Sequence, residues 1–181
     1  MPVNEPLSPY AASKKAAEAM CYSYHHLFDI DVSVVRYFTV YGPCGRPDMA
    51  MFKFVHNIER GQPIPVYGDG SQTRDFTFVD DIARGTVAAI KEVGFEVINL
   101  GAGAKPVTLA RFLELIEGEL GKKAVIDRKP FHSADMKSTS ANTAKAKAIL
   151  GWEPQVSVEE GVARTVPWHR QNAELLDQLI I

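Results

Sequence analysis

The sequence lacks the features that mark several classes of protein. Its 181 residues include only two cysteines, Cys21 and Cys44, in no C-x-x-C or His/Cys spacing, so we expect reduced thiols, no disulfide framework and no zinc or other metal site. No apolar run approaches the ~18 residues of a membrane span. The opening MPVNEPLS also lacks the basic and apolar parts of a signal peptide. These absences favour a cytoplasmic chain with no membrane partner.

The charge balance is equally plain. Lys and Arg number 20 and Asp and Glu 22, which gives a net charge of -2, and no run of basic residues occurs. Nucleic acid is therefore a poor candidate for a partner, and a small-molecule ligand is favoured. With 46% hydrophobic residues, the chain can bury a sizeable core, as one domain or as a small domain plus part of another.

Periodicity and capping signals alternate between helix and strand. Ser8 followed by Pro9 predicts the start of an alanine-rich helix that runs to about residue 28. The β-branched and aromatic residues that follow predict one largely buried strand over 32–40. Further helices are expected at 49–61, after a cap at Asp80 or Asp81, at 108–121 with Thr108 as its N-cap and Gly121 as its C-cap, and at 143–150. A last helix is expected to open with the Ser157/Glu160 capping box and to kink at Pro167. Further expected strands lie on either side of a turn around Gly68 and Gly70, at 96–100 and at 123–128.

This alternation predicts an α/β architecture with a mostly parallel sheet. Only the strands at 32–40 and 96–100 have the composition of strands buried on both faces. Two such strands are too few for the core of a doubly wound sheet. We therefore expect the chain to be part of a larger fold.

The stretch SPYAASKKAAE places a tyrosine and a lysine four residues apart on the predicted first helix. Residues at this spacing lie on one helix face. A cation beside a phenol stabilises the phenolate, so Tyr10 and Lys14 can form a general acid/base for an alcohol and its ketone. The alternative is a solvated helix face on which the two residues meet by chance.

Together with RYFTVYGPCGRPDMAMFKF and PIPVYGDGSQTRDFTFVDDIARG, this stretch resembles the extended short-chain dehydrogenase/reductase family, the NAD-dependent epimerases and dehydratases. Within that family the chain looks most like the UDP-glucuronate 4-epimerases. The resemblance implies an α/β fold in which residues 1–43 are a remnant of a Rossmann-type NAD-binding domain. Residues 44–181 would then form the nucleotide-sugar region, with 76–101 returning to the Rossmann sheet.

The resemblance also implies roles for single residues. Tyr10 matches the family's catalytic base and Lys14 the lysine that assists it and binds the nicotinamide ribose of NAD. Phe38 matches the backbone contact to the nicotinamide carboxamide, and Thr39 follows on the sugar side. The remaining matches concern the UDP-sugar. Arg46 matches a contact to the sugar, or else forms a loop salt bridge with Asp48, and Val66 and Tyr67 match contacts to the uracil, or else form a plain strand and turn. Arg74 matches a contact to the diphosphate, or else pairs with Asp75, and Asp135 also matches the family.

The sequence departs from the family in several places. It contains no G-x-x-G-x-x-G turn for the dinucleotide pyrophosphate, and it lacks the Ser or Thr that binds the reacting hydroxyl beside the tyrosine. His132 stands where the family has a Gln or Arg. The glycines of NLGAGAKP open no such motif and predict a turn. We interpret the chain as the C-terminal portion of an epimerase, begun about nine residues before its tyrosine and inactive alone.

Two alternatives remain open. One is a nucleotide-sugar 4,6-dehydratase or reductase on the same scaffold, and the other is a non-catalytic module that binds a UDP-sugar or a partner chain. In each case an uncovered strand at 32–40 would leave backbone groups unpaired. We therefore expect a homo-oligomer in which Val32, Val34 and Val35 lie near the subunit contact.

Overall fold

The computed structural model describes residues 5–103, 106–131 and 136–179. Seven helices and eight strands alternate along this part of the chain. The helices are α1 (Pro9–Phe28), α2 (Ala50–Glu59), α3 (Val79–Ala88), α4 (Leu109–Leu120), α5 (Ala144–Leu150), α6 (Val158–Gln171) and α7 (Ala173–Asp177). The strands are β1 (Val32–Tyr37), β2 (Thr39–Tyr41), β3 (Pro63–Tyr67), β4 (Thr73–Arg74), β5 (Phe76–Phe78), β6 (Phe95–Leu100), β7 (Val107–Thr108) and β8 (Val125–Lys129).

The strands form four pairs. Three are parallel, β1 with β6, β2 with β5 and β3 with β8, and the fourth, β4 with β7, is antiparallel. Parallel strands need helical crossovers, which the intervening helices supply. The predicted α/β class with mostly parallel pairing is therefore confirmed.

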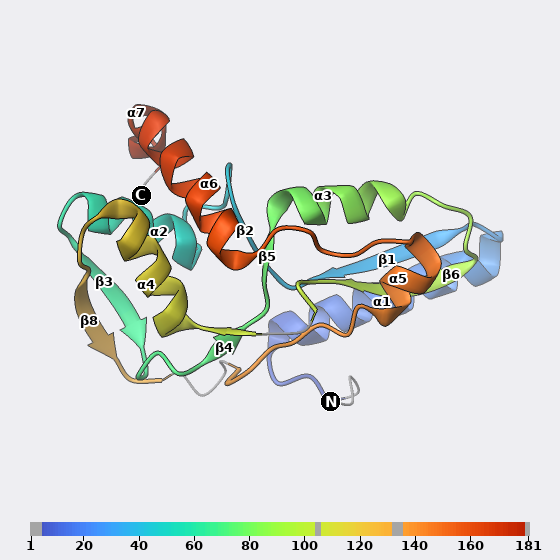
Figure 1. The fold of residues 1–181 in the computed structure, drawn as a ribbon. Coiled ribbons are helices and arrows are strands. Elements are labelled where there is room, and N and C mark those ends of the chain that lie inside the picture. The colour runs from blue at the N-terminus through green and yellow to red at the C-terminus, as the bar shows by residue number, and fades with distance from the viewer. Residues whose placement is uncertain (1–4, 104–105, 132–135, 180–181) are drawn as a thin grey trace.

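Two hydrophobic clusters hold these elements together. The larger joins α2, α4 and α6 to β3 and β5 and contains Phe112, Ile116 and Val162, each fully buried. The smaller packs α3 and α5 against β6 through Ile82, Ala146 and Ile98, and includes Trp152, which follows α5. Figure 1 shows the β1–β6 pair between α3 on one side and α1 on the other, whereas α2, α4 and α6 gather beside β3 and β8.

The predicted strand at 32–40 is wrong as a single element. The chain changes partners at Phe38, whose N–H donates to Leu100 O at 3.2 Å, while the next N–H, of Thr39, donates to Asp75 O at 3.1 Å. The segment before this residue pairs with β6 and the segment after it with β5. Phe38 is therefore a junction between two strands, which a local pattern of β-branched residues does not reveal.

Local signals placed the helix starts well, with one error. As predicted, three side chains cap helices by accepting a backbone N–H of the first turn: Ser8 for α1 at 3.1 Å, Thr108 for α4 at 3.1 Å and Ser157 for α6 at 3.2 Å. Asp80 and Asp81 do not cap α3, because the helix begins at Val79 and both carboxylates lie in its first turn. Asp81 is buried and instead accepts from Gln155 N and Val156 N, at 3.0 and 2.9 Å. The last predicted helix, α6, runs through Pro167 and ends at Gln171.

Candidate functional site

The first turn of α1 carries the phenol and the ammonium that the sequence placed together. Ser8 caps the helix and Pro9 occupies its first position, so Tyr10 stands at the helix entrance with 71% of its surface exposed. The Nζ atom of Lys14 lies 5.5 Å from the centroid of the Tyr10 ring. The two side chains therefore share one open face, where a hydroxyl of a ligand can reach the phenol.

A bidentate ion pair fixes α1 against the sheet. Arg36 of β1 donates through Nε and Nη2 to the two carboxylate oxygens of Glu18, each at 2.6 Å. These hydrogen bonds hold the pKa of Glu18 below its ordinary value. Since Glu18 lies one helical turn beyond Lys14, the pair sets the direction in which the Tyr10 face of α1 points.

Arg46 lies in the loop between β2 and α2 and belongs to the same region. Its Nε and Nη2 donate to Asp48 at 3.0 and 2.5 Å, which is the loop salt bridge given above as its alternative. This hydrogen bonding raises the pKa of Arg46, to which the nearby Tyr10 also contributes. Both members of the pair are largely exposed, so an incoming carboxylate would compete with Asp48 for the guanidinium fork.

Phe38 and Thr39 connect this region to β4 and β5. The hydrogen bond from Thr39 N to Asp75 O places the strand junction directly beside the residue that follows Arg74. Arg74 itself donates from Nη1 to Thr73 O at 2.9 Å, besides other contacts.

Asp75 is the polar centre of this connection and is 1% exposed. Its two carboxylate oxygens accept from Ala102 N at 2.5 Å, Gly103 N at 3.1 Å and Ala141 N at 2.8 Å. The loop after β6 and the segment before α5 are thereby tied to β5. Sequence reasoning considered Asp75 only as a partner for Arg74, because its backbone donors lie at least 27 residues away along the chain.

Val66 and Tyr67 end strand β3 beside a pocket of about 510 Å³. Val66 is buried in the core, whereas Tyr67 is half exposed and its carbonyl accepts from Gln72 Nε2 at 2.8 Å. The pocket is lined by Gly68, Asp69, Ser71, Gln72, Phe131 and Lys137. Gly68 has a φ of +73°, and a Cβ there would come within 3.3 Å of the Phe131 ring, so a glycine keeps this wall open.

Sequence reasoning missed Gln72, Phe131 and Lys137. The signal that could have found the last two is weak: an aromatic and a lysine flank the segment that contains Asp135. Lys137 is brought to the pocket because its carbonyl accepts from Thr73 N at 3.0 Å. Asp135 and His132 lie outside the described residues.

Other expectations concern what surrounds the site. Cys21 and Cys44 are both free thiols. In the NLGAGAKP stretch, Gly103 has a φ of +83° at the turn after β6, in keeping with the predicted turn. Among the described residues, no group of three or more His, Cys, Asp or Glu side chains is placed to hold a metal ion. Over the same residues, the helices are all too short or too polar to cross a bilayer.

Fold and site together define an α/β protein in which a Tyr-x-x-x-Lys helix packs against a parallel strand pair. The chain belongs to the NAD dependent epimerase/dehydratase family, whose sequence profile matches residues 1–101.

Individual relatives refine this likeness. The chain is 54% identical over 177 residues to the UDP-glucuronate 4-epimerase of Thermodesulfobacterium geofontis, covering 98% of this chain and 55% of that protein. A crystal structure of UDP-glucuronic acid 4-epimerase from Bacillus cereus, in complex with UDP-glucuronic acid and NAD, matches with 38% identity and a TM-score of 0.87 over 92% of this chain and 54% of that one. DesIV, a dTDP-glucose 4,6-dehydratase from Streptomyces venezuelae with NAD bound, matches with 32% identity and a TM-score of 0.89 over 97% of this chain and 55% of that one. The chain thus spans about half the length of these relatives.

Proposed function

We propose that this chain is the substrate-binding and proton-transferring portion of an NAD-dependent UDP-sugar 4-epimerase, of the UDP-glucuronate or UDP-glucose type. The observation that carries the proposal is the joint exposure of Tyr10 and Lys14 on one helix face. The high identity to a UDP-glucuronate 4-epimerase supports it. In this proposal residues 1–43 belong to a Rossmann-type domain, 44–181 to the nucleotide-sugar region, and 76–101 return to the Rossmann sheet.

The residues present fit a role beside NAD. Tyr10 and Lys14 would lie along the nicotinamide ribose and Phe38 at the carboxamide; the exposed face of α1 and the position of Phe38 at the end of β1 support this arrangement. When bound, NAD supplies the acceptor and later the donor of the hydride at C4 of the sugar. Tyr10, as phenolate, accepts the proton of the 4-hydroxyl, and the Lys14 ammonium stabilises that phenolate. The proton returns from Tyr10 to the sugar oxygen when the ketone is reduced from its other face.

The remaining residues would hold the UDP-sugar. Thr39 and Arg46 would face the sugar, where the guanidinium fork of Arg46 suits the carboxylate of a glucuronate. Arg74, and Asp135 outside the described residues, would lie at the diphosphate and nucleotide. The pocket next to Val66 and Tyr67 supports a place for the uracil, because Phe131 offers an aromatic face and Lys137 a cation.

A 4,6-dehydratase is the second candidate. The structural likeness to DesIV, which is as high as that to the epimerase, favours it. Proton transfer by Tyr10 is common to both reactions, so the product formed must separate them. A non-catalytic UDP-sugar-binding or oligomerisation module is the third candidate. The cytoplasmic location of the protein is a separate prediction.

Ligand preference tests the proposed site on this chain alone. We expect calorimetry to detect binding of UDP-glucuronate to this chain. Arg74→Ala should weaken that binding about 10-fold or more, because a charge-assisted hydrogen bond to phosphate contributes about 1.5–3 kcal/mol. NAD should show no measurable binding, because the sequence contains no G-x-x-G-x-x-G turn. Lys91→Ala, in the loop between α3 and β6, is the matched control. Clear NAD binding at micromolar concentration, or equal UDP-glucuronate binding by Arg74→Ala, would contradict the assignment.

Self-association follows from the uncovered side of α1. This helix has no buried residue, and Met20, Tyr24 and Leu27 are each more than half exposed. We expect a homo-oligomer by light scattering at micromolar concentration, with Val32, Val34 and Val35 of the adjoining strand near the contact. Leu27→Glu should shift the population to monomer, whereas Leu175→Glu, an exposed leucine on α7, should not. Light scattering that showed the wild-type chain to be a monomer at this concentration would contradict the prediction.

A further inference from the structure

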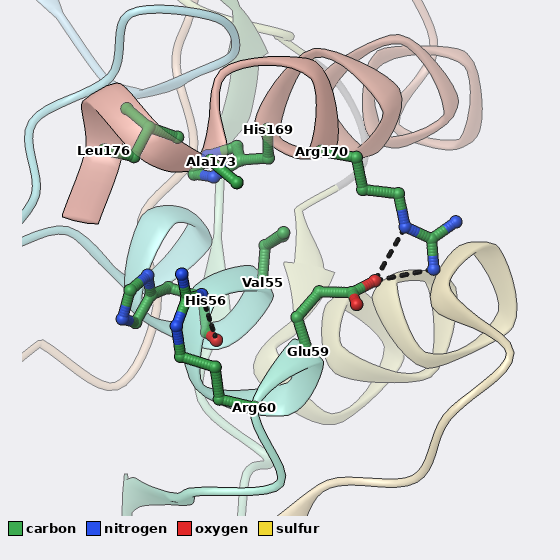
Figure 2. Close-up of a pocket in the computed structure, with 8 residues that line it drawn as sticks. All are labelled: Val55, His56, Glu59, Arg60, His169, Arg170, Ala173 and Leu176. Atoms are coloured by element: carbon green, nitrogen blue, oxygen red, sulfur yellow. Dashed lines mark hydrogen bonds and ion pairs between the residues drawn. The ribbon is translucent and has the colours of Figure 1, made fainter.

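A second pocket, of about 330 Å³, lies between α2 and the α6–α7 segment and shares no residue with the candidate site (Figure 2). Its volume is at the lower end of the range for small-molecule sites, about 300–1,000 Å³. Side chains from both helical segments line it, among them His56 and Arg60 from α2 and His169 and Arg170 from α6. The pocket is therefore a polar space bounded by two elements that are far apart in the sequence.

His169 is the unusual group in this pocket. It is 5% exposed, its ring packs edge-on against Phe52 with centroids 4.9 Å apart, and it projects from α6 toward α2. Within the described residues, no protein group forms a hydrogen bond with either ring nitrogen, and these nitrogens are not among the fully buried atoms, so they can be reached from the pocket. Burial lowers the pKa of His169 to about 4, and the neighbouring His56 adds to this effect. A neutral imidazole offers one donor and one acceptor nitrogen, so His169 can form hydrogen bonds with a molecule in the pocket.

The carboxylate in the pocket is already satisfied. One oxygen of Glu59 accepts from Arg170 Nε at 2.7 Å and the other from Lys122 Nζ at 3.0 Å. Arg60 donates to Asp177 of α7 and to His56 O. Among the described residues, the unclaimed polar atoms of the two arginines are then Arg60 Nε and Arg170 Nη1. Both of these are donors, and the Glu59 carboxylate is already paired. Arg60 lies beside His56, whereas the guanidinium of Arg170 is turned to Glu59 (Figure 2).

The charges favour the same class of ligand. Arg60, Arg170 and Lys122 face Glu59 and Asp177, which leaves one positive charge when both imidazoles are neutral. We propose that this pocket binds a small oxyanion, a sulfate, phosphate or carboxylate group, held by His169, His56 and the free N–H group of Arg60. Such an anion would bridge α2 to α6 and stabilise the packing of the C-terminal helices.

Binding at this site should be coupled to a proton. An anion beside His169 favours its imidazolium form, so the complex takes up a proton that the free protein does not hold at neutral pH. The other titratable groups that line the pocket are His56, Glu59 and Arg60 from α2 and Arg170 from α6. Asp177 of α7 pairs with His56 and Arg60, and Lys122 after α4 pairs with Glu59. The two carboxylates keep their charge near neutral pH because their cation partners lower the pKa of each, against the opposing effect of burial. Affinity should therefore rise as the pH falls from about 8 toward 5.5.

The test is a sulfate titration of the 181-residue chain, followed by the imidazole NMR signals at about pH 5.5 and about pH 8, with sodium chloride balancing the ionic strength. Sulfate keeps its charge over this range, so any pH dependence belongs to the protein. We expect saturable shifts of the His169 and His56 signals and an affinity at least ~10-fold higher at the lower pH. Acetate in a parallel titration distinguishes carboxylate from tetrahedral oxyanion as the preferred form.

Variants make the result specific. His169→Gln should abolish the pH dependence and weaken sulfate binding about 5-fold or more, whereas His26→Gln, on the exposed face of α1, should change neither. The wild-type His169 signal provides a readout even if the variant fails to fold. Sulfate that leaves this signal unmoved at both pH values, or that binds wild type and His169→Gln alike, would overturn the proposal.

Discussion

Replacing Tyr10 by Phe is expected to reduce turnover by about 10²–10⁴-fold, the usual contribution of a positioned general acid/base. The assay needs a complete enzyme, so this chain would replace the matching 177 residues of the Thermodesulfobacterium geofontis relative, which supplies the rest. Affinity for UDP-glucuronate should stay within about 3-fold, because the substitution removes one hydroxyl from an exposed ring. Initial rates with saturating NAD measure the effect.

The matched control is Tyr24→Phe, an exposed tyrosine on the same helix, which should leave the rate unchanged. Lys14→Met should lower the rate as well, because the phenolate then loses its neighbouring cation. A Tyr10→Phe chimera that turns over at the unsubstituted rate would remove Tyr10 from the mechanism.

Asp75→Ala should cause the largest loss of stability, on the order of 3–5 kcal/mol of unfolding free energy. The substitution leaves three N–H groups without their acceptor: that of the buried Ala141 and those of the partly buried Ala102 and Gly103. Asp75→Asn should also lower the free energy of unfolding, because the NH₂ group of the asparagine cannot accept a hydrogen bond from the backbone N–H groups that it would face. Urea unfolding of the 181-residue chain measures both.

Asp69→Ala serves as the comparison, because Asp69 also accepts a backbone N–H, that of Ser71 at 2.9 Å, but in an exposed turn. Its loss should cost about 1 kcal/mol or less. If the unfolding free energy of Asp75→Ala lay within about 1 kcal/mol of the wild-type value, water would be replacing the carboxylate. The connection from β5 to the two loops would then be weaker than described.

The features that the sequence predicted are those determined by near neighbours. Ser8, Thr108 and Ser157 cap helices through backbone groups three residues away, and Gly121 ends α4 in the left-handed conformation. The adjacency of Tyr10 and Lys14 follows from helical spacing alone. These contacts depend on the helix alone, so they can be predicted without knowledge of the tertiary structure.

The features that the sequence did not reveal depend on distant partners. The strand break at Phe38 comes from hydrogen bonds to residues 75 and 100, and the role of Asp81 from donors at residues 155 and 156. Phe131 and Lys137 reach their pocket only through the pairing of β3 with β8 and of Thr73 with residues 137–139. No local pattern encodes these contacts, because each is a meeting of segments more than 30 residues apart along the chain.

The product formed from UDP-glucuronate by the chimera tests the central claim most directly. Proton NMR of the nucleotide sugar, with catalytic NAD, should show the 4-epimer growing to an equilibrium mixture with no net reduction of NAD, because the hydride leaves and returns at the same carbon. The Tyr10→Phe chimera should yield no epimer on the same timescale. A chimera that folds and binds UDP-glucuronate and NAD but forms no 4-epimer, or that instead converts UDP-glucose to a 4-keto-6-deoxy sugar, would contradict the assignment as a 4-epimerase.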